Sequence, residues 1–284
     1  MRVEKAIFER HIHPLTPVPT GVAPRLEGMQ NFRAMLFDVY GTLLISGSGD
    51  IGISRGQSVE EDDLRDLLRR CHIDRTPDGL PTALHRAIEQ EHAKARRQGI
   101  DFPEVDIVRV WQTLLGVGDL NRLKSFILEY ELTVNPVYPM PGLTTLLSTC
   151  RARRLPMGII SNAQFYTPYL MEWFLGSSLE ESGFDPRLTF LSYRLGHAKP
   201  SMVMFKRAAD ELSRIGIPAE AALYVGNDML NDIRPASAVG FRTALFAGDA
   251  RSLRSRESDN RCRGRSTDLI VTDLRQLITG IVNP

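Results

Sequence analysis

Cysteine is scarce in this sequence, and long apolar segments do not occur in it. Its three cysteines, Cys71, Cys150 and Cys262, are too few and too scattered for a disulfide framework or a zinc site. No apolar run approaches the ~20 residues needed to span a membrane, and residues 1–32 carry no apolar block of secretory type. These absences predict a reduced, cytoplasmic location and no membrane partner.

Neither sign of charge dominates the chain. The formal net charge is +1, so no overall field attracts nucleic acid or an anionic membrane surface. The 43% apolar and 24% charged composition is that of an ordinary globular protein with ample material for a core. We therefore expect a small-molecule partner rather than nucleic acid.

Short apolar runs alternate with helical patterns in residues 33–47 and 136–284. Such alternation predicts an α/β fold, a doubly wound and mostly parallel sheet covered by helices on both faces. Residues 1–32, rich in proline and charge, are interpreted as an N-terminal extension. The predicted strands are AMLF (34–37), MGII (157–160), LTFLSY (188–193), ALYV (222–225), TALF (243–246) and LIV (269–271).

Residues 48–135 have a different pattern, with helices and no convincing strand. Ser58 and Glu61 match a capping box ahead of LRDLLRRC, while Pro81 and Gly99 suit the start and end of a second helix. Two more helices are predicted over 105–116 and 121–132. This block is predicted to be an inserted helical domain. The charged segment 251–268 is interpreted as a solvated surface loop.

Polar side chains follow four of the predicted strands. Because the carboxyl ends of parallel strands share one edge of a sheet, these side chains are expected to meet in one crevice. They are Asp38, Thr42, Ser161, Asn162, Lys199, Asn227, Asp228 and Asp232.

This set of side chains suits phosphoryl transfer. A carboxylate can act as a nucleophile, and neighbouring carboxylates favour a cation between them. Oxygen ligands with retained waters suit Mg²⁺. A lysine with hydroxyl and amide donors can offset the charge that develops in the transition state.

Four motifs occur in order, each after a predicted strand: DVYGT (38–42), SN (161–162), HAKPS (197–201) and GNDMLND (226–232). With them, the chain over roughly 33–280 resembles the haloacid dehalogenase (HAD) superfamily of hydrolases, which have a Rossmann-like core. The helical block at 48–135 corresponds in place to the cap that the family inserts between its first two motifs.

The resemblance implies a role for each matching residue. Asp38 would be the nucleophile, with Ser161 and Lys199 binding the transferred group and Thr42 and Asn162 assisting substrate binding. Mg²⁺ would be held by Asp38, the backbone carbonyl of Tyr40 and Asp228, with Asp232 as a supporting or alternative ligand.

Tyr40 leaves the type of reaction open. Family phosphatases usually have a second aspartate there, whereas family dehalogenases have tyrosine, because halide leaves without a proton. Dehalogenases, however, typically have asparagine at the position assigned to Asp228, and tyrosine at that of Phe205. They also bind the substrate carboxylate with a cap arginine, for which Arg55 is the nearest candidate.

The expectation is therefore a Mg²⁺-dependent phosphatase of a small phosphorylated metabolite. The alternatives are a metal-independent 2-haloacid dehalogenase, or a catalytically weak binding or regulatory protein. In the cap, His72, His85 and His92 are further candidates for substrate contact.

Overall fold

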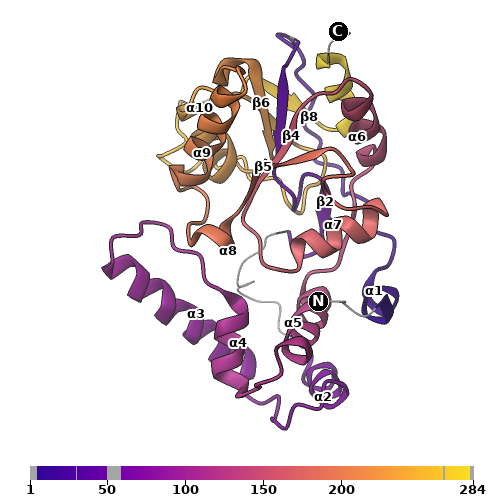
Figure 1. The fold of residues 1–284 in the computed structure, drawn as a ribbon, viewed down its shortest axis with the longest axis vertical. Helices are drawn as coiled ribbons and strands as arrows, with labels where there is room; N and C mark the ends of the chain where they lie inside the picture. The colour runs from indigo at the N-terminus through magenta and orange to yellow at the C-terminus, as the bar shows by residue number, and fades with distance from the viewer. Residues whose placement is uncertain (1–4, 30, 50–58, 265, 282–284) are drawn as a thin grey trace.

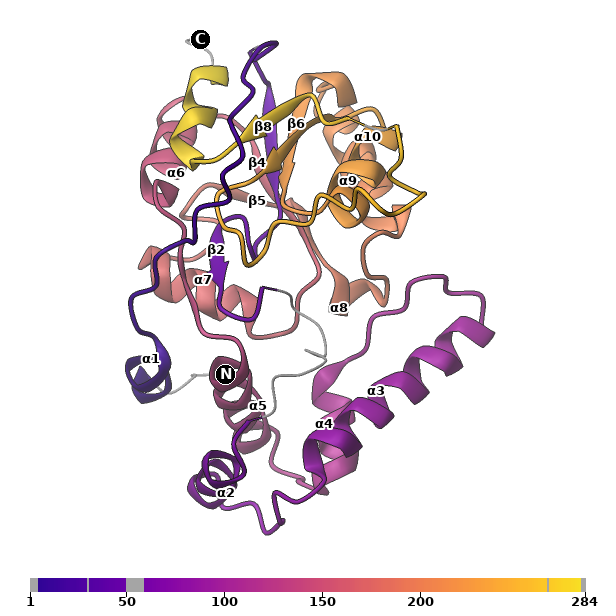
Figure 2. The same ribbon diagram turned by 180° about the vertical axis from the view of Figure 1, so that it is seen from behind.

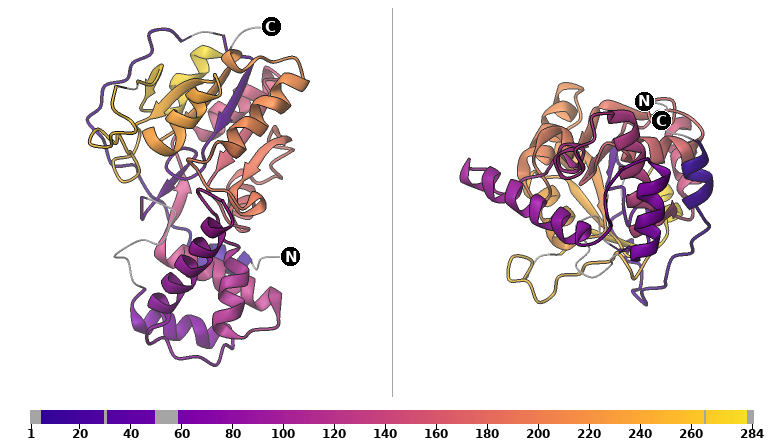
Figure 3. Two further views of the ribbon diagram at one scale, coloured as in Figure 1. Left: turned by 90° about the vertical axis from the view of Figure 1, so that its left-hand side faces the viewer. Right: turned by 90° about the horizontal axis from the view of Figure 1, so that it is seen from below.

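The computed structural model describes residues 5–29, 31–49, 59–264 and 266–281. The chain forms an α/β core with a smaller lobe of helices below it, as Figure 1 and the side view in Figure 3 show. None of the described helices is long and apolar enough to cross a membrane.

Six parallel strands form the core sheet in the order β5-β4-β1-β6-β7-β8. The order reverses at β1, which has β4 on one side and β6 on the other, so the predicted doubly wound α/β fold is confirmed. In such sheets the reversal opens a crevice at the carboxyl ends of the strands. The strands are β1 (Ala34–Phe37), β4 (Met157–Ser161), β5 (Phe184–Leu191), β6 (Ala222–Gly226), β7 (Arg242–Phe246) and β8 (Leu269–Val271).

Strand β1 is fully buried, and its side chains alternate between the two faces of the sheet. Met35 and Phe37 pack into the larger apolar cluster, which extends to the cap, while Ala34 and Leu36 pack into a second cluster with helix α9. Burial on both faces explains why this strand is a continuous apolar run. The first acidic residue, Asp38, follows where the strand ends.

Helices cover both faces of the core sheet, as Figure 2 shows from behind. Strand β5 begins earlier than predicted, and the end of the predicted segment is a short helix instead, α8. The core helices are α6 (Leu143–Ala152), α7 (Thr167–Leu175), α8 (Ser192–Leu195), α9 (Met202–Arg214) and α10 (Arg234–Ala238). The 3₁₀ helices η1 (Ala219–Ala221) and η3 (Leu274–Gly280) and the π-helical segment η2 (Met229–Ile233) complete the core.

Four helices form the cap: α2 (Glu61–Arg70), α3 (Leu80–Arg97), α4 (Ile107–Leu115) and α5 (Leu120–Val134). The described part of this block, 59–134, contains no strand, as predicted. The N-cap of α2 is Glu60, whose side chain makes no capping hydrogen bond. The predicted capping box involves Ser58, which lies outside the described residues. A two-stranded antiparallel ribbon, β2 (Leu44–Ser46) with β3 (Val137–Pro139), links cap and core and was not predicted.

The N-terminal segment packs against both lobes. Helix α1 (Lys5–His11) buries Ile7 and Phe8, and the Phe8 ring stacks on Trp173 of α7 with 4.9 Å between centroids. Two ion pairs connect α1 to Glu129 of α5 in the cap. The following residues run along the core, where Arg25 forms an antiparallel bridge with Ile270 of β8.

Candidate active site

Asp38 lies directly after β1, and its backbone N–H donates to the Val225 carbonyl of β6. The residue is 7% exposed. Its Oδ1 accepts hydrogen bonds from Ser161 Oγ at 2.7 Å and is 2.7 Å from Lys199 Nζ. Within the described part of the chain, no donor contacts Oδ2. Asp38 therefore has one carboxylate oxygen held by donors and one available to attack a substrate.

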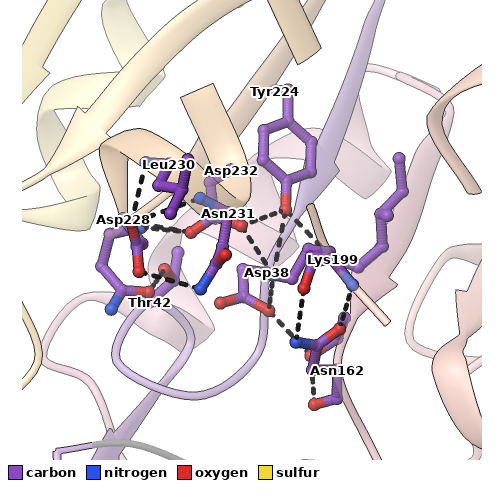
Figure 4. A network of polar contacts seen from close by, with 12 residues as sticks. Asp38, Thr42, Asn162, Lys199, Tyr224, Asp228, Leu230, Asn231 and Asp232 are labelled. Carbon is purple, nitrogen blue, oxygen red and sulfur yellow. Dashed lines mark hydrogen bonds and ion pairs between the residues drawn. The ribbon is translucent and has the colours of Figure 1, made fainter. Parts of the chain in front are cut away.

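Lys199 is buried between two carboxylates, with Nζ 2.6 Å from Asp232 Oδ1 and 2.7 Å from Asp38 Oδ1 (Figure 4). Burial alone would lower the pKa of this amine, but Asp232 and Asp38 raise it above its ordinary value. Lys199 is therefore a fixed positive charge at the nucleophile.

Asp232 is buried and accepts hydrogen bonds from Tyr224 Oη at 2.9 Å and from the N–H groups of Asn227 and Asp228. Its burial, with some repulsion from the two other carboxylates, raises its pKa to about 7 against the opposing effect of Lys199. The preceding Gly226 is required here, because a Cβ at this position would lie 2.4 Å from Asp232 Cγ.

The carboxylate of Asp228 is paired with Arg256, a contact that the sequence did not predict. Arg256 Nε and Nη2 lie 3.1 and 2.6 Å from its two carboxylate oxygens. The same oxygens accept from the backbone N–H groups of Leu230 and Asn231 and from the Asn231 side chain. Both oxygens of Asp228 are therefore already bound, and its charge is neutralised by a guanidinium.

Asn227, not Asp228, contacts the loop that follows the nucleophile. Its Oδ1 accepts a hydrogen bond from Thr42 Oγ1 at 3.2 Å, and its Nδ2 donates to the Ser252 carbonyl at 2.7 Å. Thr42 is thus held in the first loop by an amide of the fourth motif, and its expected part in substrate binding stays a prediction.

The hydroxyl of Tyr40 is paired with a threonine and is not placed for acid–base catalysis. Its Oη lies 2.9 Å from Thr167 Oγ1, and burial is the main cause that raises its pKa above the ordinary value. It therefore keeps its proton at any physiological pH. Tyr40 therefore does not supply the acid that phosphatases obtain from an aspartate at this position.

Asn162 holds the loop that carries Lys199. Its Oδ1 accepts from the Lys199 backbone N–H at 2.6 Å, and its Nδ2 donates to the Lys199 carbonyl at 3.5 Å. Ser161 and Asn162 of the second motif and Lys199 of the third are thus brought together, as predicted. Arg55 lies outside the described residues.

A small cavity of about 50 Å³ connects these side chains. Three carboxylates (Asp38, Asp228 and Asp232) and two cations (Lys199 and Arg254) line it. A third cation, Arg256, pairs with Asp228, so the formal charges of these six side chains balance.

One of the expected Mg²⁺ ligands is paired with a cation in this arrangement. The expected set itself has only two carboxylates, Asp38 and Asp228, with the Tyr40 carbonyl, and in the described ranges no group of three or more His, Cys, Asp or Glu side chains is placed to hold a metal ion. The carboxylate expected to bind the ion, Asp228, is held by Arg256, and a cation has to compete with that bidentate pair. The magnesium ligands expected from the sequence stay a prediction.

Three contributing residues were not recognised in the sequence. Tyr224 is part of a buried apolar strand, yet its hydroxyl contacts Asp232 and lies 3.4 Å from Lys199 Nζ. A buried tyrosine hydroxyl usually has a polar partner, which was the only available signal. Arg254 and Arg256 lie in the segment interpreted as solvated surface, and that interpretation is wrong for these two side chains.

A model of the haloacid dehalogenase-like hydrolases matches residues 32–240, which is most of the chain. This protein is a HAD-like hydrolase. The match begins just before β1 and includes all four motifs and the cap. A comparison with curated proteins finds no match.

Solved structures agree with the fold of this HAD-like hydrolase. A 2-haloacid dehalogenase from Pseudomonas syringae pv. tomato DC3000 has a TM-score of 0.53 at 20% identity, covering 88% of this chain and 97% of the other. A predicted phosphoglycolate phosphatase from Haemophilus somnus 129PT has a TM-score of 0.49 at 14% identity, covering 89% and 99%. A Bacillus subtilis protein bound to magnesium has a TM-score of 0.47 at 19% identity, covering 88% and 98%. Only the first of these three has a TM-score above 0.5, and at 20% identity it supports the fold alone.

Proposed function

We propose that this HAD-like hydrolase uses Asp38 as a nucleophile without a metal ion and that its substrate is a 2-haloacid. The observation that carries the proposal is the pair of neighbours in the fourth motif. Asn227 contacts the loop of the nucleophile, whereas Asp228 is neutralised by Arg256. A Mg²⁺-dependent phosphatase, which the sequence favoured, would need a charged and available Asp228 beside Asp38.

The first step needs no proton donor. Asp38 Oδ2 attacks C2 of the haloacid, a carbon–oxygen bond forms, and the carbon–halogen bond breaks with its electron pair leaving as halide. Halide is a stable anion, so Tyr40 can replace an acidic residue without loss. Lys199 offers the positive charge that a substrate carboxylate requires.

The second step hydrolyses the ester on Asp38. Water adds to Cγ of Asp38, and negative charge develops on Oδ1, the oxygen that already accepts from Ser161 and lies 2.7 Å from Lys199. These two donors therefore serve as an oxyanion hole. The bond between Cγ and Oδ2 then breaks, and Oδ2 leaves as the hydroxyl oxygen of the product. One proton of the water goes to the 2-hydroxyacid, the other goes to solvent, and the Asp38 carboxylate is restored.

A Mg²⁺-dependent phosphatase of a small phosphate ester is the second candidate. It is favoured by the three carboxylates Asp38, Asp228 and Asp232 at one cavity. When bound, the ion would supply positive charge to the phosphoryl oxygens. Of this chain's groups, Asp38, the Tyr40 carbonyl and Asp228 would hold it, and Arg256 has to release Asp228 first.

Two release assays on the full chain distinguish the candidates. Halide release from 2-chloropropionate and phosphate release from p-nitrophenyl phosphate are each measured with chelator and with Mg²⁺. We expect halide release in chelator, reduced by about 10³-fold or more in Asp38→Asn. Phosphate release that requires Mg²⁺, without halide release, would establish the second candidate and contradict the first. No release of either product would support a binding or regulatory role.

The Arg256→Met variant adds a matched control for the metal. It frees Asp228 and leaves Asp38, Ser161 and Lys199 in place. Under the proposal, halide release in this variant remains independent of Mg²⁺. If phosphatase activity appears or rises with Mg²⁺ in this variant, Asp228 is a metal ligand that Arg256 covers.

A further inference from the structure

A second and larger cavity lies between the cap helices and the core. It has a volume of about 300 Å³, and we call it the cap cavity. Apolar and aromatic side chains of α3, α4 and α5 line it, among them Leu84, Ile88, Trp111, Ile127 and Tyr130. Its core side is formed by the loop after β4 and by Ala198. In Figure 1 these three cap helices lie below the carboxyl ends of the core strands.

The cap cavity adjoins the smaller cavity at Asp38. Asn162 lines both cavities, and it also holds the backbone of Lys199. The cavity at Asp38, of about 50 Å³, has room for a reacting group and little else. Any larger part of a substrate has to lie elsewhere, and the cap cavity is the adjoining space.

The described lining of the cap cavity disfavours a second anionic group. No lysine or arginine belongs to the lining within the ranges that the structure describes, while Glu104 and Glu131 do. Glu104 accepts from Ser192 Oγ at 2.7 Å and from Gln164 Nε2 at 3.1 Å, and burial raises the pKa of both carboxyls. An anion placed here would be desolvated without a cationic partner.

One polar atom of the lining has no partner. His92 lines the cavity, and its buried Nε2 makes no hydrogen bond to any described residue. Burial lowers the pKa of this imidazole, so it is neutral. A ligand hydroxyl can donate to or accept from either tautomer of a neutral imidazole.

We propose that the cap cavity holds the part of the substrate that points away from Asp38, and that this part is an uncharged, mostly aromatic group of about two fused rings with a hydroxyl. The size follows from the volume, since an apolar cavity of about 150 Å³ holds one benzene ring. The hydroxyl would meet His92 Nε2. This inference rests on the proposed function only for the assignment of the occupant as part of a substrate.

Binding of 2-naphthol to the full chain tests the cavity without any turnover. Fluorescence titration is expected to show saturable binding to wild type and equally to Asp38→Asn. Leu84→Trp fills the cavity and should weaken binding at least tenfold. Leu80→Trp is the matched control, since Leu80 is buried on the same helix one turn earlier and does not line the cavity. It should bind as wild type does.

His92→Phe removes the unpartnered imidazole nitrogen and gives a second test in case Leu84→Trp misfolds. The variant should weaken the binding of 2-naphthol at least fivefold and leave unchanged the binding of naphthalene, which has no hydroxyl. Thermal unfolding shows whether each variant is folded; if Leu84→Trp is not, the His92→Phe comparison decides. Absence of 2-naphthol binding to folded wild type, or equal loss for both ligands in His92→Phe, would overturn the proposal.

Turnover then separates this inference from the proposed function. With 2-chloro-3-(6-hydroxy-2-naphthyl)propionate, kcat/KM should exceed that for 2-chloropropionate by roughly tenfold or more in wild type, and not in Leu84→Trp. If 2-naphthol binds as expected and no haloacid is turned over, the cavity assignment stands and the proposed reaction fails.

Discussion

Replacing Glu129 with glutamine should release helix α1 from the cap. Glu129 has a side chain only 4% exposed, and its Oε1 lies 2.6 Å from Arg10, 2.7 Å from Arg70 and 2.9 Å from His11. Burial would raise the pKa of this carboxyl, but the hydrogen bonds from His11, Arg10 and Arg70 outweigh it and lower the pKa to about 2.

The pKa shift sets the size of the effect. The pKa of Glu129 falls from an ordinary 4.5 to about 2, and a shift of this size corresponds to a free-energy difference of about 3 kcal/mol between the two protonation states. Arg10 and Arg70 are 46% and 39% exposed, so solvent screens the pairs. We therefore expect Glu129→Gln to lower the free energy of unfolding by about 2 kcal/mol, or roughly 4–8 °C in the thermal midpoint.

The measurement is thermal unfolding together with tryptophan fluorescence, because Phe8 of α1 stacks on Trp173. Glu9→Gln is the control on the same helix. Glu9 pairs with Lys5 on the exposed surface, so its substitution should change the midpoint very little. Equal midpoints for Glu129→Gln and Glu9→Gln would refute the reasoning.

The pH dependence of this contribution has a definite sign. A lowered pKa in the folded state stabilises the protein above the unfolded value of 4.5, and the stabilisation disappears as pH falls toward about 2. The gap between wild type and Glu129→Gln should therefore close over that range. A gap of the same size near pH 2 and at pH 7 would contradict it.

Three further predictions concern the site. Gly226→Ala places a Cβ 2.4 Å from Asp232 Cγ and should reduce kcat at least tenfold while circular dichroism stays native; unchanged kcat would show that Asp232 can move freely. Lys199→Met removes the cation at Asp38 Oδ1 and should reduce kcat for halide release roughly 10²–10³-fold. A loss of less than tenfold would show that Lys199 does not stabilise the oxyanion. Tyr40→Phe removes only the bond to Thr167, so kcat should stay within about threefold at every pH while stability falls by about 1 kcal/mol; a lost limb in the pH–rate profile would reveal an acid–base role.

The fold could be predicted because strand identity depends on local patterns. AMLF, MGII and ALYV are short apolar runs that are followed by Asp38, Ser161 and Gly226, and all three became neighbouring parallel strands. The ribbon at Val137–Pro139 was missed because a proline-rich segment favours a joint, and its pairing with Leu44–Ser46 spans the whole cap. Helix α1 was missed because its support comes from Trp173 and Glu129, far along the chain.

The site could be predicted only as far as motif order determines position. Asp38, Ser161 and Lys199 converge because their strands are parallel and adjacent. Which of two neighbours, Asn227 or Asp228, contacts the first loop depends on the backbone turn between them. That Arg256 reaches Asp228 depends on the course of a long loop, for which the sequence contains no periodic signal.

Isotope labelling of Asp38 tests the central claim most directly. Full-length protein turns over 2-chloropropionate in H₂¹⁸O with chelator present, and the peptide containing Asp38 is then analysed by mass spectrometry. If Asp38 is the nucleophile of a metal-independent reaction, ¹⁸O accumulates in its carboxylate over successive turnovers, because water attacks Cγ. Turnover with the label only in the hydroxyacid and none in Asp38 would contradict the account.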